Sequence, residues 1–146
     1  MTKSQTICIV DDEAAIRETL ENVLSDEGYP VMSCRDSISF FEMLAMQTPD
    51  LVLLDIWLPG IDGMAILSKL RESHPELPVI MMSGHAGIDA AVSAIKLGAV
   101  DFMEKPLRLE ILLDKIAVVL SNKPPERMKD LASDTGMEVA KIINPI

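Results

Sequence analysis

Short apolar runs alternate with longer amphipathic stretches over most of the chain. The runs LVLL at 51–54 and VIMM at 79–82 are apolar at every position, which is typical of strands buried on both faces of a sheet. The longer stretches place apolar residues three or four positions apart, as at Ile16, Leu20 and Leu24, and this period indicates helices. The pattern predicts strands at 6–10, 30–34, 51–54, 79–82 and 100–104, and helices at about 14–27, 37–47, 64–73, 88–97 and 107–121.

Five strand–helix units in succession predict an α/β fold with a doubly wound, five-stranded parallel sheet and helices on both of its faces. The strand order 2-1-3-4-5 suits such a chain, with the order reversing beside the first strand. Right-handed crossovers then bring the carboxyl ends of all strands to one edge of the sheet. Because ligands of these sheets bind outside that edge, the residues that follow each strand are the candidates for a site.

Composition narrows the classes of function. Hydrophobic residues make up 49% of the 146 residues but aromatic residues only 3%, so we expect an aliphatic core and no stacking platform for bases. The net charge of −10 argues against direct binding to nucleic acid or to an anionic membrane. No apolar run has membrane-spanning length and the stretch before Asp11 is too short for a signal peptide, so a cytoplasmic location is expected. Cys8 and Cys34 lie in predicted strands and are expected to be buried, reduced thiols.

The sequence changes character after the last predicted helix. We predict one domain over 1–121 and a linker and tail over 122–146, with Pro124-Pro125 as the linker signal. The segment TGME at 135–138 matches a capping box before a short apolar run, which is compatible with a short helix. Its apolar side could pack on the domain, contact a partner or lead into a further domain, and the sequence leaves these alternatives open.

The residues at the predicted strand ends form an unusual set. The first strand is followed by Asp11 and Asp12, the third by Asp55, the fourth by Ser83 and the fifth by Lys105. Taken singly, each has an ordinary explanation, because Asp often caps a helix, Lys-Pro often precedes one and Ser often lies in a turn. Their joint occurrence at the same end of neighbouring strands favours a functional site instead.

Three carboxylates at one sheet edge call for a cation. They repel one another by on the order of 4 kcal/mol per pair at about 4 Å and an effective dielectric of ~20. Mg²⁺ suits the cluster because it takes oxygen ligands and keeps water sites that phosphate oxygens can replace. We predict direct binding by Asp12 and Asp55, binding by Asp11 largely through water, and a further ligand in the backbone carbonyl of Trp57.

Asp55 follows the central strand, where a carboxylate can attack phosphorus and become an aspartyl phosphate. Phosphoryl transfer requires in-line positioning and neutralisation of the three phosphoryl oxygens. The metal ion can neutralise one oxygen, the Lys105 ammonium a second, and the Ser83 hydroxyl with a nearby backbone N–H the third. The strand-end set therefore contains a residue type for each task.

Four motifs resemble those of the receiver domains of two-component response regulators: IVDDE ending at Glu13, LVLLDIWLPGIDG at 51–63, VIMMSGHA at 79–86 and GAVDFMEKPL at 98–107. The resemblance covers about residues 5–121. It implies the flavodoxin-like form of the fold, Mg²⁺ as cofactor and a sensor histidine kinase as phosphoryl donor. The segments DIWLPGIDG and LSDEGY further resemble the nitrogen-regulation class, whose members are sigma-factor activators that control transcription.

The resemblance also assigns roles to individual residues. Phe102 matches the aromatic switch residue, and the peptide bond between Lys105 and Pro106 is expected to be cis. Ser83 stands where Thr is commoner, and the bulky Trp57 is expected to affect the rate of phosphate loss. The strand-end residues take these roles by resemblance: phosphoacceptor Asp55, metal-binding acids Asp11 and Asp12, switch hydroxyl Ser83, and phosphate-pairing Lys105.

Phosphorylation is expected to draw Ser83 toward the phosphate and to let Phe102 turn inward. The face formed by the fourth helix, fifth strand and fifth helix would change, and partners or a second copy of the chain would read it. On this hypothesis the chain is a switch that phosphorylates and dephosphorylates itself, not a turnover enzyme.

Three other classes share parts of this pattern. Magnesium-dependent phosphohydrolases that form an aspartyl phosphate place their nucleophile in a DxD motif after the first strand, whereas Asp11 and Asp12 are adjacent. Receiver-like binding modules without phosphorylation typically lack the acidic pair or the lysine. A flavin-binding electron carrier is disfavoured because the first loop, DDEAA, repels phosphate.

Overall fold

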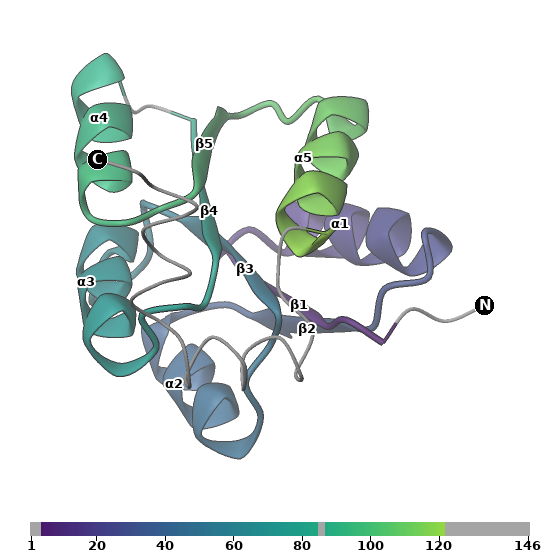
Figure 1. Ribbon diagram of the computed structural model, residues 1–146, viewed down its shortest axis with the longest axis horizontal. Coiled ribbons are helices and arrows are strands. Elements are labelled where there is room, and N and C mark those ends of the chain that lie inside the picture. Colours follow the sequence, from purple (N-terminus) through teal and green to yellow (C-terminus); the bar gives the residue numbers. More distant parts are fainter. Residues whose placement is uncertain (1–3, 85–86, 122–146) are drawn as a thin grey trace, which may run out of the picture.

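The structure is a computed structural model that describes residues 4–84 and 87–121. Strands and helices alternate strictly, as the hydrophobic pattern predicts (Figure 1). The strands are β1 Ile7–Val10, β2 Val31–Cys34, β3 Leu51–Asp55, β4 Val79–Ser83 and β5 Asp101–Glu104, and the helices are α1 Ala14–Asp26, α2 Ser37–Met46, α3 Gly63–Ser73, α4 Ile88–Lys96 and α5 Leu109–Ser121.

The five strands form one parallel sheet in the order β2-β1-β3-β4-β5, which confirms the predicted doubly wound topology. Helices α1 and α5 cover one face of the sheet, and α2, α3 and α4 cover the other (Figure 1). Two predicted strand ends were one residue short, because Asp55 and Ser83 are the last residues of β3 and β4 and not the first residues after them. Both side chains are therefore held by the sheet itself.

Each face of the sheet carries its own aliphatic core. Leu53 and Ile80 point to the α1–α5 side, whereas Val52 and Met81 point to the side of α2, α3 and α4. Cys8 and Cys34 are buried, free thiols with their sulfur atoms 4.0 Å apart, as expected. The central strands are thus apolar on both faces, and the polar residues that end them, Asp55 and Ser83, lie at the carboxyl edge of the sheet.

Local features stop the helices where the sequence predicts. Gly28 and Gly98, which follow α1 and α4, both have a positive φ, 94° and 105°, that a side chain would disfavour. Asp36 and Ser39 form a capping box at the start of α2. Helix α5 extends to Ser121, the last of the described residues, and the predicted boundary between 121 and 122 stays a prediction. Pro124-Pro125 and the short helix suggested near 135–138 lie outside the described residues.

A search of residues 4–84 and 87–121 finds no helix that is both long and apolar enough to cross a membrane.

Candidate functional site

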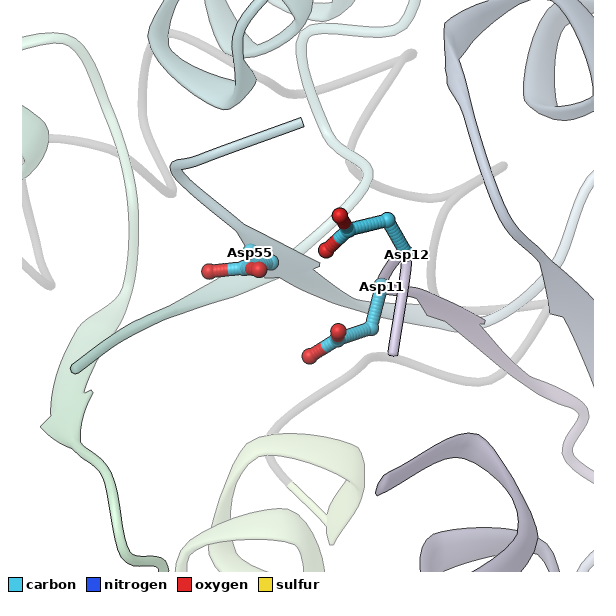
Figure 2. Close-up of side chains that lie close together, drawn as sticks. All are labelled: Asp11, Asp12 and Asp55. Atoms are coloured by element: carbon cyan, nitrogen blue, oxygen red, sulfur yellow. The ribbon is translucent and has the colours of Figure 1, made fainter. Parts of the chain in front are cut away.

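Neighbouring strands bring the predicted site residues to one edge of the sheet. Asp11 follows β1 directly, Asp55 and Ser83 end β3 and β4, and Lys105 follows β5. Because β1, β3, β4 and β5 are consecutive in the sheet, these side chains lie side by side. Figure 2 shows the side chains of Asp11, Asp12 and Asp55 close together at the ends of their strands.

The three carboxylates lie close enough to share an ion. One oxygen of each of Asp11, Asp12 and Asp55 lies within 4.8 Å of the others. Asp11 is 0% exposed and Asp55 3% exposed, whereas Asp12 faces solvent. Burial first, and the charge of Asp11 second, raise the pKa of the Asp55 carboxyl, although Lys105 and a hydrogen bond from the Trp57 backbone partly oppose them. The site therefore resists carrying its full negative charge.

Lys105 compensates part of that charge. Its ammonium lies 2.7 Å from Asp11 Oδ2, 3.2 Å from Asp55 Oδ2 and 3.4 Å from Glu13 Oε1, with only 11% of the side chain exposed. Burial alone would lower the pKa of Lys105, but its hydrogen bonds and charge interactions with Asp11 and Asp55 outweigh burial, so the pKa is raised. One ammonium thus ties together acids that come from β1, β3 and the start of α1.

Both carboxylate oxygens of Asp11 already have a partner. Its Oδ1 accepts from the backbone N–H of Glu13 at 2.9 Å. Its Oδ2 is buried and lies 2.7 Å from the Lys105 ammonium. Carboxylate oxygens, together with water, are the ligands that Mg²⁺ prefers. The donor set of three carboxylates fits Mg²⁺.

The ordinary explanation for the acidic residues fails in the structure. Glu13 is the N-cap residue of α1, but its side chain makes no capping hydrogen bond, and Asp12 lies outside the cap position. Asp62, seven residues after Asp55, is the real cap of α3 and accepts from the backbone of Ala65 at 2.9 Å. Asp12 and Asp55 therefore cap neither α1 nor α3, and their carboxylates belong to the cluster at the sheet edge.

The remaining predicted residues surround this cluster. Ser83 is fully buried, and its backbone carbonyl accepts from the Lys105 N–H at 2.9 Å. Phe102 lies half-buried on β5 and packs against the core on the α4 side of the sheet. Trp57 is 58% exposed beside Asp55, and the Lys105–Pro106 peptide bond is cis as expected. The ligand role of the Trp57 carbonyl stays a prediction.

Two contacts of the site were not predicted from the sequence. Glu13 reaches the Lys105 ammonium at 3.4 Å, and Arg17 donates to the backbone carbonyl of Asp11 at 2.7 Å. Arg17 lies one helical turn after Glu13 on α1, so both side chains point back toward the site. This spacing of one helical turn was the one feature of the sequence that could have indicated the two contacts. It is not specific, because charged residues recur at the same spacing on many solvent-exposed helix faces.

Comparisons with known proteins agree with this geometry. The family described as the response regulator receiver domain matches residues 7–117. The nitrogen assimilation regulatory protein NtrX of Azorhizobium caulinodans is 45% identical over 109 residues, which are 73% of this chain and 24% of that protein. The chain thus spans about a quarter of the length of this curated relative.

Solved structures give the same result. The receiver domain of NtrX from Brucella abortus is 44% identical, with a TM-score of 0.76 over 80% of this chain and 99% of that chain. The beryllofluoride-activated NtrC4 receiver domain dimer is 32% identical, with a TM-score of 0.76 over 80% of this chain and 96% of that chain. The names of these relatives agree with the nitrogen-regulation class that the motifs resemble.

Proposed function

This chain belongs to the response regulator receiver domain family, and from that premise we propose that it is a phosphoacceptor switch controlled by a sensor histidine kinase. Asp55 receives the phosphoryl group in a reaction that depends on Mg²⁺, and the output is control of transcription. One observation carries the proposal: Asp11, Asp12 and Asp55 converge at a sheet edge where Lys105 contacts two of them.

The residues present would hold the ion as the sequence predicts. Asp12 and Asp55 would offer carboxylate oxygens directly, and Asp11, whose carboxylate completes the cluster, would bind largely through a metal-bound water. The Trp57 carbonyl is the proposed backbone ligand. When bound, Mg²⁺ supplies positive charge that neutralises a phosphoryl oxygen.

Transfer then needs little covalent chemistry from the protein. A carboxylate oxygen of Asp55 forms the new bond to phosphorus while the bond from phosphorus to the donor's histidine nitrogen breaks, and that nitrogen keeps the electron pair. The Lys105 ammonium, already 3.2 Å from Asp55, pairs with one phosphoryl oxygen. The Ser83 hydroxyl binds another and so links phosphorylation to β4.

A groove on this chain, beside the site, is the proposed docking surface for the phosphoryl donor. A groove of about 190 Å³ lies between α1 and the segment after β5, and its lining includes Ile16, Leu20, Leu107 and Lys105. The groove is mostly apolar and ends at the lysine that contacts Asp55. An amphipathic helix that carries the phosphohistidine would fit there, with its apolar side on the groove and its imidazole at Asp55.

The opposite side of the site provides the output surface. Helix α4 exposes Val92 and Ile95, and α5 exposes Val118. A 2.6 Å ion pair between Asp101 of β5 and Lys115 of α5 links these two elements. We propose that phosphorylation changes this face through Ser83 and Phe102, and that a second copy of the chain binds to it. The beryllofluoride-activated NtrC4 receiver domain is a dimer, which supports pairing of two copies as the readout. The chain acts as a self-phosphorylating and self-dephosphorylating switch, not as a turnover enzyme, and is proposed to work in the cytoplasm.

Labelling with acetyl phosphate and Mg²⁺, followed by intact mass and peptide mapping, tests the acceptor. The wild-type chain should gain one phosphoryl group, and Asp55→Asn should gain none because an amide oxygen is a poor nucleophile. Asp62→Asn is the matched control, since it changes an exposed Asp of the same connection and keeps a helix-capping side chain. Full labelling of Asp55→Asn, or labelling without a divalent ion, would contradict the proposal.

A further inference from the structure

Helix α4 is weakly attached to the sheet along its length. Ala94 is its one buried residue, and the other inward positions are also alanines, Ala90 and Ala91, which are half-buried. Its larger apolar side chains point outward, with Ile88 82% and Val92 45% exposed. A buried alanine contributes little apolar area, so packing alone holds α4 loosely.

The C-terminal end of α4 is held in a different way, by Arg71 from the last turn of α3. The Arg71 guanidinium donates hydrogen bonds to the carbonyls of Pro75, at 3.1 Å, of Leu77, and of Gly98, at 3.5 Å. Pro75 and Leu77 belong to the connection from α3 to β4, and Gly98 is the turn residue after α4. One side chain thus joins three segments at the edge of the sheet opposite the acidic site.

The local backbone is shaped to receive Arg71. A Cβ added to Gly98 would lie 2.6 Å from Arg71 Cδ, so only glycine leaves room for the stem of the arginine. The turn is closed by hydrogen bonds from the N–H of Gly98 to Ile95 and from the N–H of Ala99 to Ala94, both at 3.0 Å. Arg71 adds a cationic donor to the carbonyl of Gly98, two residues beyond the last residue of α4, and a cation suits this end of a helix.

The charge of Arg71 is partly buried in an unusual environment. Within residues 4–84 and 87–121, no carboxylate pairs with it, and its buried Nε has no hydrogen-bond partner. Burial lowers the pKa of the guanidinium without a compensating anion. Removing a cation partly from water costs free energy, and backbone carbonyls alone do not compensate it as a carboxylate would. The structural consequence of this arrangement is that the three segments are fixed relative to one another.

Among the described residues, the N-terminal end of α4 is packed only weakly. Its first residue, Ile88, is 82% exposed, and a Cβ added to the N-cap residue Gly87 would meet nothing within 4 Å. This end lies at the edge of the sheet where Ser83 ends β4. The helix is therefore fixed at the end away from the site and loose at the end next to it.

We infer that Arg71 is a positioning residue that fixes the C-terminal end of α4 as a pivot, so that a change at Ser83 tilts the helix instead of displacing it as a whole. The inference rests on the proposed function for the event that moves the helix, which is phosphorylation of Asp55. The fixed C-terminal end of α4, in contrast, is a property of the unphosphorylated, resting protein. It adds a role for a residue that touches neither the metal-binding acids nor the phosphoacceptor.

Amide hydrogen exchange of the full chain, followed residue by residue by NMR, tests the pivot. Arg71→Met keeps the apolar stem and removes the guanidinium, and Lys69→Met, on an exposed position of the same helix, is the matched control. In the resting protein we expect Arg71→Met to speed exchange at Leu97, Gly98 and Ala99 about tenfold, the effect of losing a charge-assisted hydrogen bond. Exchange at Ala91 should stay within about twofold of the control.

The second measurement adds Mg²⁺ and beryllofluoride as a phosphoryl mimic. In wild type the exchange rates should change near Ala91 and not near Gly98, whereas in Arg71→Met the change should reach Gly98. Labelling of Asp55 by acetyl phosphate should stay within about twofold of wild type in both variants, which a general loss of folding would not allow.

The outcomes separate the two proposals. If the wild type does not respond to beryllofluoride or is not labelled, the proposed function fails, and the resting exchange rates still decide the pivot. If Arg71→Met leaves exchange at Gly98 unchanged, the pivot is wrong. Should Arg71→Met fail to fold, Gly98→Ala displaces the arginine stem instead, and an unchanged exchange pattern at Leu97 and Ala99 in that variant would overturn the inference.

Discussion

Helices α3 and α4 lie next to each other on the same face of the sheet, yet they are attached to it in opposite ways. α3 buries Ile66, Leu67 and Leu70 completely, whereas α4 buries only Ala94. α4 instead turns Val92 and Ile95 to the outside. The comparison shows how one layer of a small domain can combine a fixed helix with one that a small change in free energy can move.

The difference is large in energetic terms. Complete burial of a leucine or isoleucine side chain contributes about 1.5–3 kcal/mol, and a single methyl group about 0.8 kcal/mol. Three such side chains therefore hold α3 by several kcal/mol more than the alanine of α4 contributes. On the proposed function, a phosphoryl group on Asp55 would add nearly two charges beside β4 and would act on the weaker of the two attachments.

The largest expected effect on the free energy of unfolding comes from weakening the packing of α3 on the sheet. Leu67→Ala should lower the free energy of unfolding by about 2–5 kcal/mol, because it removes buried methyl groups and leaves a cavity. Val92→Ala, on the outward side of α4, should change it by less than about 0.5 kcal/mol. Urea unfolding at pH 7 measures both. Equal losses in the two variants would show that α3 and α4 are attached with similar strength.

A smaller effect is expected from the inner side of α4. Ala94→Gly should cost about 1–2 kcal/mol, from lower helix propensity together with one lost buried methyl group. Ser93→Gly, on an exposed position of the same helix, should cost only the propensity difference of about 0.5 kcal/mol. Urea unfolding again gives the difference. If both glycine variants lose the same stability, Ala94 contributes no packing and α4 is held by its C-terminal end alone.

Much of the fold could be predicted because it depends on patterns that lie along the chain. The uniformly apolar runs at β3 and β4 identify strands buried on both faces, and the strand count then fixes one edge for the site. Asp55 and Ser83 were predictable for the same reason, since each is the first polar residue after such a run, and Lys105 was predictable from its place directly after the fifth strand. The structure brings them together as expected.

Side-chain contacts between distant elements could not be predicted in this way. Arg71 and Gly98 are 27 positions apart, and neither residue stands out from the hydrophobic pattern. The same pattern misleads for α4, because Ile88, Val92 and Ile95 recur at helical spacing and yet are exposed. Periodicity identifies an apolar side of a helix, and only the packing decides whether that side faces the sheet or a partner.

The smallest expected effect concerns the charge at the end of β3, the strand that leads into α3 and pairs with the strand that leads into α4. Burial and the neighbouring Asp11 raise the pKa of Asp55 in the folded state, so its ionised form opposes folding at neutral pH when no metal ion is present. Asp55→Asn should therefore be slightly more stable than wild type at pH 7 in a chelating buffer, within about 1 kcal/mol. The gain should shrink as the pH falls through the raised pKa and vanish below the ordinary aspartate range near pH 4, where the wild-type carboxyl is protonated in both states.

Urea unfolding between about pH 4 and pH 7 measures this pH dependence, with Asp62→Asn as the exposed control. A gain that does not depend on pH, or a loss of stability at pH 7, would mean that Lys105 fully compensates the cluster and that no repulsion is stored where α3 and α4 begin.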